Sequence, residues 1–130
     1  MTDAPAYFSA DDLREFATDI FRGHGLSAED ALVVAGCLVQ ANLRGVDSHG
    51  VSRIPVYAER LRRKLVEPRP VIRIERVATA AATVDGGGGM GFLVATRAMA
   101  EAVAIATDHG IGLASAHHST HFGAAATYGL

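Results

Sequence analysis

The sequence lacks the features of a membrane-spanning or secreted protein. It has 130 residues and only one cysteine, so no internal disulfide can form and a reducing compartment is expected. No apolar run reaches spanning length, because Arg44, Asp85 and Glu101 interrupt the candidates. The N-terminus has no basic segment followed by an apolar core, which argues against a signal peptide. We therefore expect a soluble, cytoplasmic protein with no membrane partner.

An excess of charge of one sign is also missing. Twelve basic residues stand against 14 acidic ones, a formal net charge of −2, so no overall field attracts nucleic acid. The densest basic stretch, RLRRKL at 60–65, alternates with leucines and favours a solvated helix face over a phosphate-binding patch. The single cysteine, Cys37, lies among apolar neighbours, which predicts a buried and inert thiol.

The first section of the chain, residues 1–68, is predicted to be helical. Ser9 and Ser27 each precede an acidic residue by three positions, a pattern typical of a helix start. Apolar residues at helical spacing follow each serine, and glycines at 23–25 and at 45 end the two helices. A third helix is predicted over 52–65, and the prolines of VEPRP end it.

The second section, residues 69–130, has a β-β-α-β pattern. Extended segments are predicted at 71–77 and 80–85, a helix at 92–109 and a further strand in IGLASA. With the helical section before it, the chain is assigned to the α/β (α+β) class.

The glycine run DGGGGMG formally matches a dinucleotide-binding fingerprint at Gly86, Gly88 and Gly91. A true fingerprint has an acidic residue at the end of the next strand, about 20 residues on. Here that strand ends in His117 and His118. We therefore predict a non-Rossmann fold, in which the run is a flexible turn where backbone passes close to another element.

The segment DSHGVSRIPVY places His49, Arg53 and Tyr57 four residues apart. Because proline is tolerated in a first turn, the helix should start near Ser52, so that Arg53 and Tyr57 share a face and His49 precedes them in a loop. Arginine offers a fork for a carboxylate, tyrosine a hydroxyl donor, and histidine a proton shuttle. The set suits a small organic acid, although an arginine and a tyrosine at this spacing are also common surface residues.

The segment HHSTHFG carries three histidines. His117 and His121 are four apart, but no nearby carboxylate or cysteine completes a ligand set, so no metal site is predicted. His121 precedes a candidate helix near Gly123, whose amides would favour a neutral imidazole and a bound anion. The alternative is that Ser119 or Thr120 is a simple N-cap and His121 is structural.

Three blocks of the sequence together resemble the type 2 malate/L-lactate dehydrogenase family. This NAD(P)-dependent group also includes ureidoglycolate and sulfolactate dehydrogenases. The blocks cover nearly the whole chain and occur in the family's order: ANLRGVDSHGVSRIPVYAERLRRKLVEPRP, ATVDGGGGMGFLVATRAM and GIGLASAHHSTHFGAAATY.

The resemblance implies an oxidoreductase that interconverts a 2-hydroxy acid and its 2-oxo acid by hydride transfer with NAD or NADP. His121 matches the family's catalytic histidine, a general acid/base, and Arg53 matches the residue that holds the substrate carboxylate. His49 and Tyr57 match flanking pocket positions, and Ser48 lines the same loop. Family members are usually homodimers or larger.

No cofactor-binding residue is assigned in this chain. Family members continue well past residue 130 and draw most cofactor contacts from that continuation, so the chain is expected to be a truncated N-terminal portion, inactive alone. The alternative is a non-catalytic fragment that serves only as a folding or dimerisation module. The sequence leaves open which 2-hydroxy acid or imine is used and whether the carrier is NAD or NADP.

Overall fold

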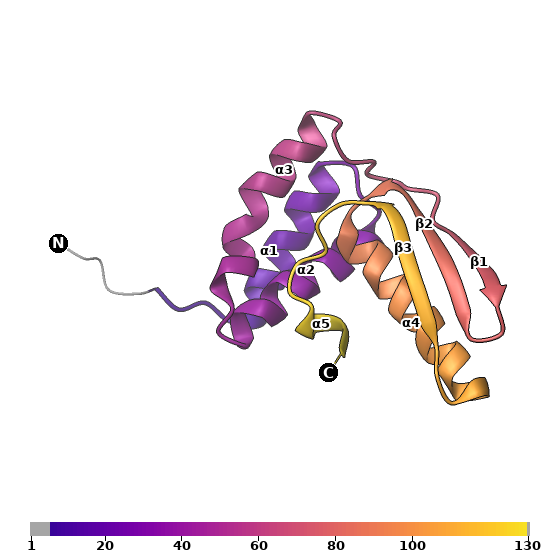
Figure 1. The fold of residues 1–130 in the computed structure, drawn as a ribbon. Coiled ribbons are helices and arrows are strands. Elements are labelled where there is room, and N and C mark those ends of the chain that lie inside the picture. Colours follow the sequence, from indigo (N-terminus) through magenta and orange to yellow (C-terminus); the bar gives the residue numbers. More distant parts are fainter. Residues whose placement is uncertain (1–5, 130) are drawn as a thin grey trace.

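Three helices form one layer of the molecule and lie beside a small sheet (Figure 1). The computed structural model describes residues 6–129. The helices of this layer are α1 (Ala10–Gly23), α2 (Ala28–Leu43) and α3 (Ile54–Arg62). Ser9 Oγ accepts a hydrogen bond from the Asp12 N–H at 3.0 Å, and Ser27 Oγ accepts one from Asp30 at 3.1 Å. The two predicted helix starts are therefore confirmed.

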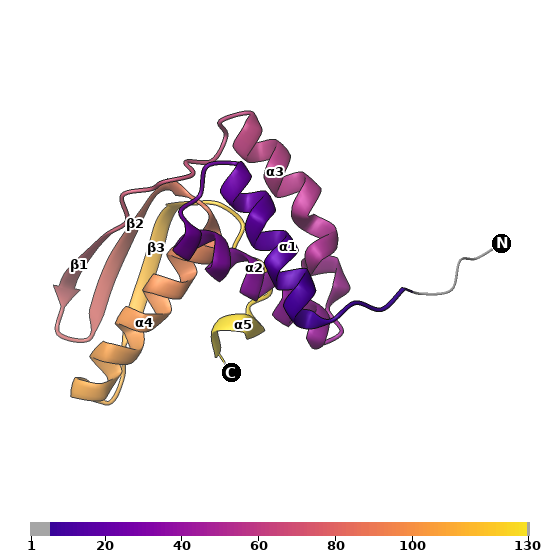
Figure 2. The same ribbon diagram turned by 180° about the vertical axis from the view of Figure 1, so that it is seen from behind.

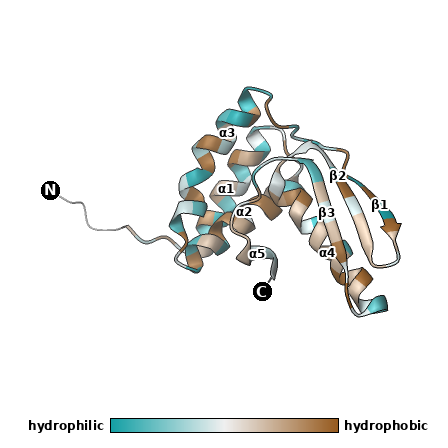
Figure 3. Ribbon diagram, in the orientation of Figure 1, coloured by the Kyte–Doolittle hydropathy of each residue, from teal (hydrophilic) through white to brown (hydrophobic). Residues whose placement is uncertain are grey.

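The third helix differs from its prediction at both ends. Two 3₁₀ turns, η1 (Asp47–His49) and η2 (Val51–Arg53), precede it, and Pro55 lies in its first turn as expected. The helix ends at Arg62 instead of residue 65, because the chain leaves the helix through Lys64 with a left-handed φ of 57°. Hydrophilic residues gather at this end of α3 (Figure 3).

The sheet has the order β1-β2-β3, with β1 (Arg73–Ala78), β2 (Ala81–Gly89) and β3 (Leu113–Ser119). β1 pairs antiparallel with β2, and β2 pairs parallel with β3. The parallel connection runs through α4 (Gly91–His109), which lies along one face of the sheet (Figure 2). A four-residue helix, α5 (Ala126–Gly129), follows β3. The predicted α/β class and the β-β-α-β order are confirmed.

The prediction of a flexible turn at the glycine run is wrong. Gly86 to Gly89 belong to β2, although its pairing with β3 is irregular between Asp85 and Gly89, where Gly87 and Gly88 have left-handed φ angles of 57° and 76°. The expected close approach is present, since an added Cβ at Gly86 would stand 2.8 Å from the His118 carbonyl oxygen, and one at Gly89 2.5 Å from the Pro70 ring. The glycines therefore extend the strand through a space that side chains would block.

The larger core joins the helical layer to α4. Phe21, Leu38 and Tyr57 pack in one buried cluster with Phe92 and Leu93 of α4. A smaller cluster of Val84, Val94 and Ala98 lies between β2 and α4. Cys37 borders the larger cluster, and burial raises the pKa of its thiol, as expected for an inert cysteine, although its side chain is only partly buried. Within residues 6–129, no helix has the length and apolar character that crossing a membrane requires.

Candidate active site

The loop that presents Ser48, His49 and Arg53 is fixed by a single side chain of α2. Asn42 Nδ2 donates to Asp47 Oδ1 at 2.6 Å, and Asn42 Oδ1 accepts from the Val51 N–H at 2.8 Å. One amide therefore joins η1 to η2. Gly50 lies directly against this amide, and an added Cβ there would overlap it.

Asn42 was missed in the reasoning from the sequence. The available signal was a short amide side chain in the last turn of an apolar helix, just before the polar loop. A short amide side chain at that position competes well for neighbouring backbone groups.

The segment that carries His121 rests on the last glycine of the run. The Gly91 N–H donates to Thr120 Oγ1 at 3.1 Å, and Thr120 Oγ1 donates to the Gly89 carbonyl at 3.3 Å. An added Cβ at Gly91 would overlap the Thr120 carbonyl and the His121 backbone. The glycine therefore gives the His121 segment room to lie on the start of α4.

His121 does not lie at the start of a helix, contrary to expectation. α5 begins at Ala126, and His121 belongs to an irregular segment before it. The backbone turns at Gly123, which has a left-handed φ of 79°. Gly123 also packs on the Phe92 ring, which leaves no room for a side chain there. Thr120 bonds to the first residue of α4 and not to α5, so it is not the N-cap that the alternative interpretation offered.

The two segments meet at Tyr57 and His121. Tyr57 Oη lies 2.9 Å from His121 Nδ1, and the buried Tyr57 ring packs edge-on against Phe92 with centroids 5.2 Å apart. The His49 ring stacks on His121 at 5.6 Å, and Ser48 Oγ lies 2.9 Å from His49 Nδ1. Four of the five predicted site residues thus form one contact chain from Ser48 through His49 and His121 to Tyr57.

Tyr57 can support either tautomer of His121, because a hydroxyl both donates and accepts. When Nδ1 carries the proton, it donates to Tyr57 Oη and leaves a lone pair at Nε2. When Nδ1 is unprotonated, it accepts from Tyr57 and from the Gly123 N–H at 3.2 Å, and the proton is at Nε2. The Nδ1–H tautomer has the lone pair of a base at Nε2, and the imidazolium that forms when this lone pair takes up a proton is the acid that returns it.

Positive charge surrounds His121. The pKa of His121 is lowered by burial first, and then by the charges of His49, Arg53 and Arg60. Arg53 is partly buried, and within the described chain no carboxylate forms an ion pair with it. The surroundings of His121 therefore suit an organic anion.

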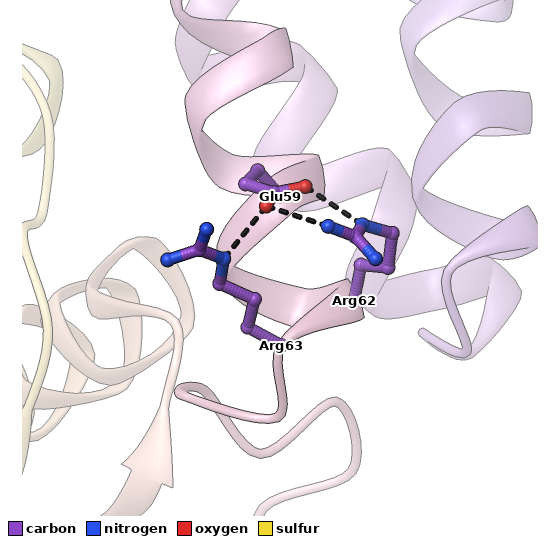
Figure 4. Close-up of polar contacts among 3 residues, drawn as sticks. All are labelled: Glu59, Arg62 and Arg63. Atoms are coloured by element: carbon purple, nitrogen blue, oxygen red, sulfur yellow. Dashed lines mark hydrogen bonds and ion pairs between the residues drawn. The ribbon is translucent and has the colours of Figure 1, made fainter.

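Two other arginines of the basic stretch, Arg62 and Arg63, pair with a carboxylate away from His121. Glu59 accepts hydrogen bonds from Arg62 and Arg63, each at 2.7 Å (Figure 4). These bonds, with Arg62 the larger cause, lower the pKa of Glu59 to about 2. Both arginines are largely exposed, as the predicted solvated helix face requires.

The residues around the glycine run do not form a cradle for the pyrophosphate of a dinucleotide. Such a cradle needs open backbone amides at the start of the following helix. Here the first amide of α4 is bonded to Thr120, and the glycines before it pack against Pro70 and Val71. The described residues therefore do not fit a nicotinamide dinucleotide at this position.

The expectation that no carboxylate lies near the histidines of HHSTHFG is wrong. Pairing of β2 with β3 brings Asp85 beside His117 and His118. No local pattern in the sequence indicated this contact, since the aspartate precedes the histidines by more than 30 residues.

Comparisons with known proteins agree on one family. The model of the malate/L-lactate dehydrogenase family matches residues 8–130. A malate dehydrogenase of Pyrococcus horikoshii is 40% identical over 120 residues, covering 92% of this chain and 33% of that protein. An L-sulfolactate dehydrogenase of Methanocaldococcus jannaschii is 34% identical over 88% of this chain and 33% of its own length.

A solved structure shows the same fold. The malate dehydrogenase from Pyrococcus horikoshii OT3 superposes with a TM-score of 0.88 at 37% identity, over 95% of this chain and 38% of that one. The chain thus spans about a third of the length of the relatives it matches.

Proposed function

The chain belongs to the malate/L-lactate dehydrogenase family, and on that premise we propose that it carries the substrate half of a 2-hydroxy-acid dehydrogenase. The reaction is the interconversion of a 2-hydroxy acid and its 2-oxo acid. Relatives named for malate and sulfolactate, both 2-hydroxy acids, support this substrate class. The observation that carries the proposal is the 2.9 Å contact between Tyr57 and His121, which joins the two motifs into one polar site.

Arg53 is proposed to bind the substrate carboxylate. Its planar fork matches two carboxylate oxygens, and it has no internal acidic partner among the described residues. It stands at the start of α3, one turn before Tyr57, in the loop that Asn42 fixes. Arg53 is close enough to His121 for its charge to lower the pKa of that ring, so a carboxylate bound at Arg53 would belong to the same site.

His121 is proposed to move the proton. In oxidation its Nε2 lone pair takes the hydroxyl proton of the substrate while Nδ1–H donates to Tyr57. In reduction Nε2–H returns a proton to the oxo oxygen. NAD or NADP, bound by residues outside those described here, would exchange the hydride with the substrate carbon.

The test is steady-state kinetics of a full-length protein carrying this chain, with L-malate, L-lactate and L-sulfolactate and with NAD⁺ or NADP⁺. Arg53→Gln should raise KM for the preferred acid by about 10- to 100-fold, since a hydrogen bond between charged groups contributes about 1.5–3 kcal/mol. Arg22→Gln, at an exposed arginine of α1, is the control and should leave KM unchanged. An unchanged KM in the Arg53 variant, or no turnover of any 2-hydroxy acid, would contradict the proposal.

A further inference from the structure

We propose that Asp85, His117 and His118 form a binding site for a divalent transition-metal ion such as Zn²⁺, where β2 and β3 run side by side. Each residue offers one ligand atom, and these atoms all lie within 4.8 Å of one another. The site is separate from the contact between Tyr57 and His121, because it shares no side chain with it.

The backbone brings the three residues together. Asp85 and His117 are register partners in the parallel pairing of β2 with β3, so their separation is set by the ladder and not by long side chains. His118 follows directly with a left-handed φ of 49°, and its ring lies 4.7 Å from that of His117. Both imidazoles therefore reach the same carboxylate.

The two separations between histidine nitrogens and carboxylate oxygens are close to those between ligands of one metal ion. His118 Nδ1 lies 3.2 Å from Asp85 Oδ1, and His117 Nε2 lies 3.9 Å from Asp85 Oδ2. Around a tetrahedral Zn²⁺ with bonds of about 2.0–2.1 Å, neighbouring ligand atoms are about 3.4 Å apart. Small side-chain rotations would therefore place all three atoms around one ion.

The chemistry of the set suits a transition metal. Imidazole nitrogen and carboxylate oxygen both bind Zn²⁺, and three protein ligands leave a position for water. The Gly87 N–H donates to Asp85 Oδ1 at 2.9 Å and orients the carboxylate, as partners of metal ligands commonly do. A bound ion would join the glycine segment of β2 to β3, three residues before His121.

A plain hydrogen bond between Asp85 and His118 is the competing explanation. It requires only one histidine and no ion, and it gives no role to His117. The two explanations therefore differ in what removal of His117 does to metal affinity.

The experiment is isothermal titration of the 130-residue chain with ZnCl₂, with His117→Ala, His118→Asn and Asp85→Asn beside it. Asparagine tolerates the left-handed backbone at position 118, and at position 85 it keeps an acceptor for the Gly87 N–H. His109→Ala, at an exposed histidine of α4, is the matched control. Circular dichroism without metal checks that each variant is folded.

We expect one Zn²⁺ per chain, with affinity reduced at least about tenfold in each of the three cluster variants and unchanged in the control. The melting temperature should rise with Zn²⁺ in the parent chain and not in the His117 variant. Absence of binding in the parent chain would overturn the proposal. So would affinity that survives loss of His117 and is lost in His121→Ala, because the ion would then sit between His49 and His121.

Discussion

At the scale of single residues, the site depends on how its neighbours set the proton affinity of His121. The ring is held by Tyr57 and Gly123 at Nδ1, and His49 stacks on one side of it. Burial and the nearby positive charges both disfavour the imidazolium. The neutral ring with its proton at Nδ1 is the form that the proposed oxidation needs, and both effects favour a neutral ring.

The pKa of His121 should lie below its ordinary value of 6.5. Oxidation needs the neutral form, so its rate should rise with pH through this lowered pKa and level off above it. Reduction needs the protonated form, so its rate should fall with pH through the same pKa. NMR titration of the His121 ring in the 130-residue chain measures the value directly.

The matched variant for this titration is His49→Gln, which removes one of the neighbouring charges. It should raise the pKa of His121, whereas His24→Gln, in the turn after α1, should leave it unchanged. A His121 pKa at or above 6.5 in the parent chain would contradict this account of the site's electrostatics. So would a His121 pKa that is the same in the parent chain and in the His49→Gln variant.

At the scale of elements, the site is built by α2 and α4 as much as by the segments that carry its polar side chains. Asn42 at the end of α2 holds the two 3₁₀ turns, and Gly91 at the start of α4 supports the His121 segment. Both residues hold other segments in place, and neither has a side chain suited to acid/base catalysis. Substitutions of Asn42 and of Gly91 test the two contacts separately.

Asn42→Ala should remove both hydrogen bonds to the loop and leave the Val51 N–H without its acceptor. A loss of about 1–2 kcal/mol in the free energy of unfolding is expected from an unpaired, partly buried amide. Urea denaturation measures it, with Gln40→Ala on the same helix as the control. Equal stability of the Asn42 variant and the parent would show that another contact fixes the loop.

Gly91→Ala should destabilise the chain although alanine is the better helix former. The added methyl would overlap the backbone at Thr120 and His121, and such overpacking costs about 1–3 kcal/mol. Gly36→Ala in α2 is the opposite case, since nothing lies within 4 Å of its added Cβ, and it should stabilise by about 0.5–1 kcal/mol. A gain in stability from both variants in thermal melts would disprove the close packing at Gly91.

Local sequence signals predicted the helices better than the strands. Serine caps and terminal glycines are read from neighbouring residues, and they gave the starts of α1 and α2 correctly. The glycines at the end of β2 carry no strand signal, because glycine is depleted in strands. They are needed there because the backbone of β3 and the Pro70 ring leave no room for side chains. The start of α5 was missed for the same reason, since Gly123 turns against Phe92.

The sequence proposed residues for the candidate site, but it did not predict the contacts between them. Arginine, tyrosine and histidine types indicated binding of an acid, and the family resemblance singled out His121. The contact between Tyr57 and His121 spans 64 residues, and the Asp85 contact with His118 spans 33. Neither is accessible to reasoning from spacing along one helix.

At the scale of the whole molecule, one core holds both parts of the site. Tyr57 from the helical layer and Phe92 from α4 pack in the same buried cluster, directly beneath His121. The loop fixed by Asn42 and the segment resting on Gly91 are thereby held against each other. The chain, which spans about a third of the length of its relatives, thus contains one connected polar site.

The most direct test of this account is the activity of His121→Ala in a full-length protein carrying this chain, with its preferred 2-hydroxy acid. Loss of general acid/base catalysis should lower kcat by about 10²- to 10⁴-fold, with little change in KM because Arg53 still binds the carboxylate. His109→Ala should behave as the parent. Full activity in the His121 variant would contradict the central claim that this histidine moves the proton.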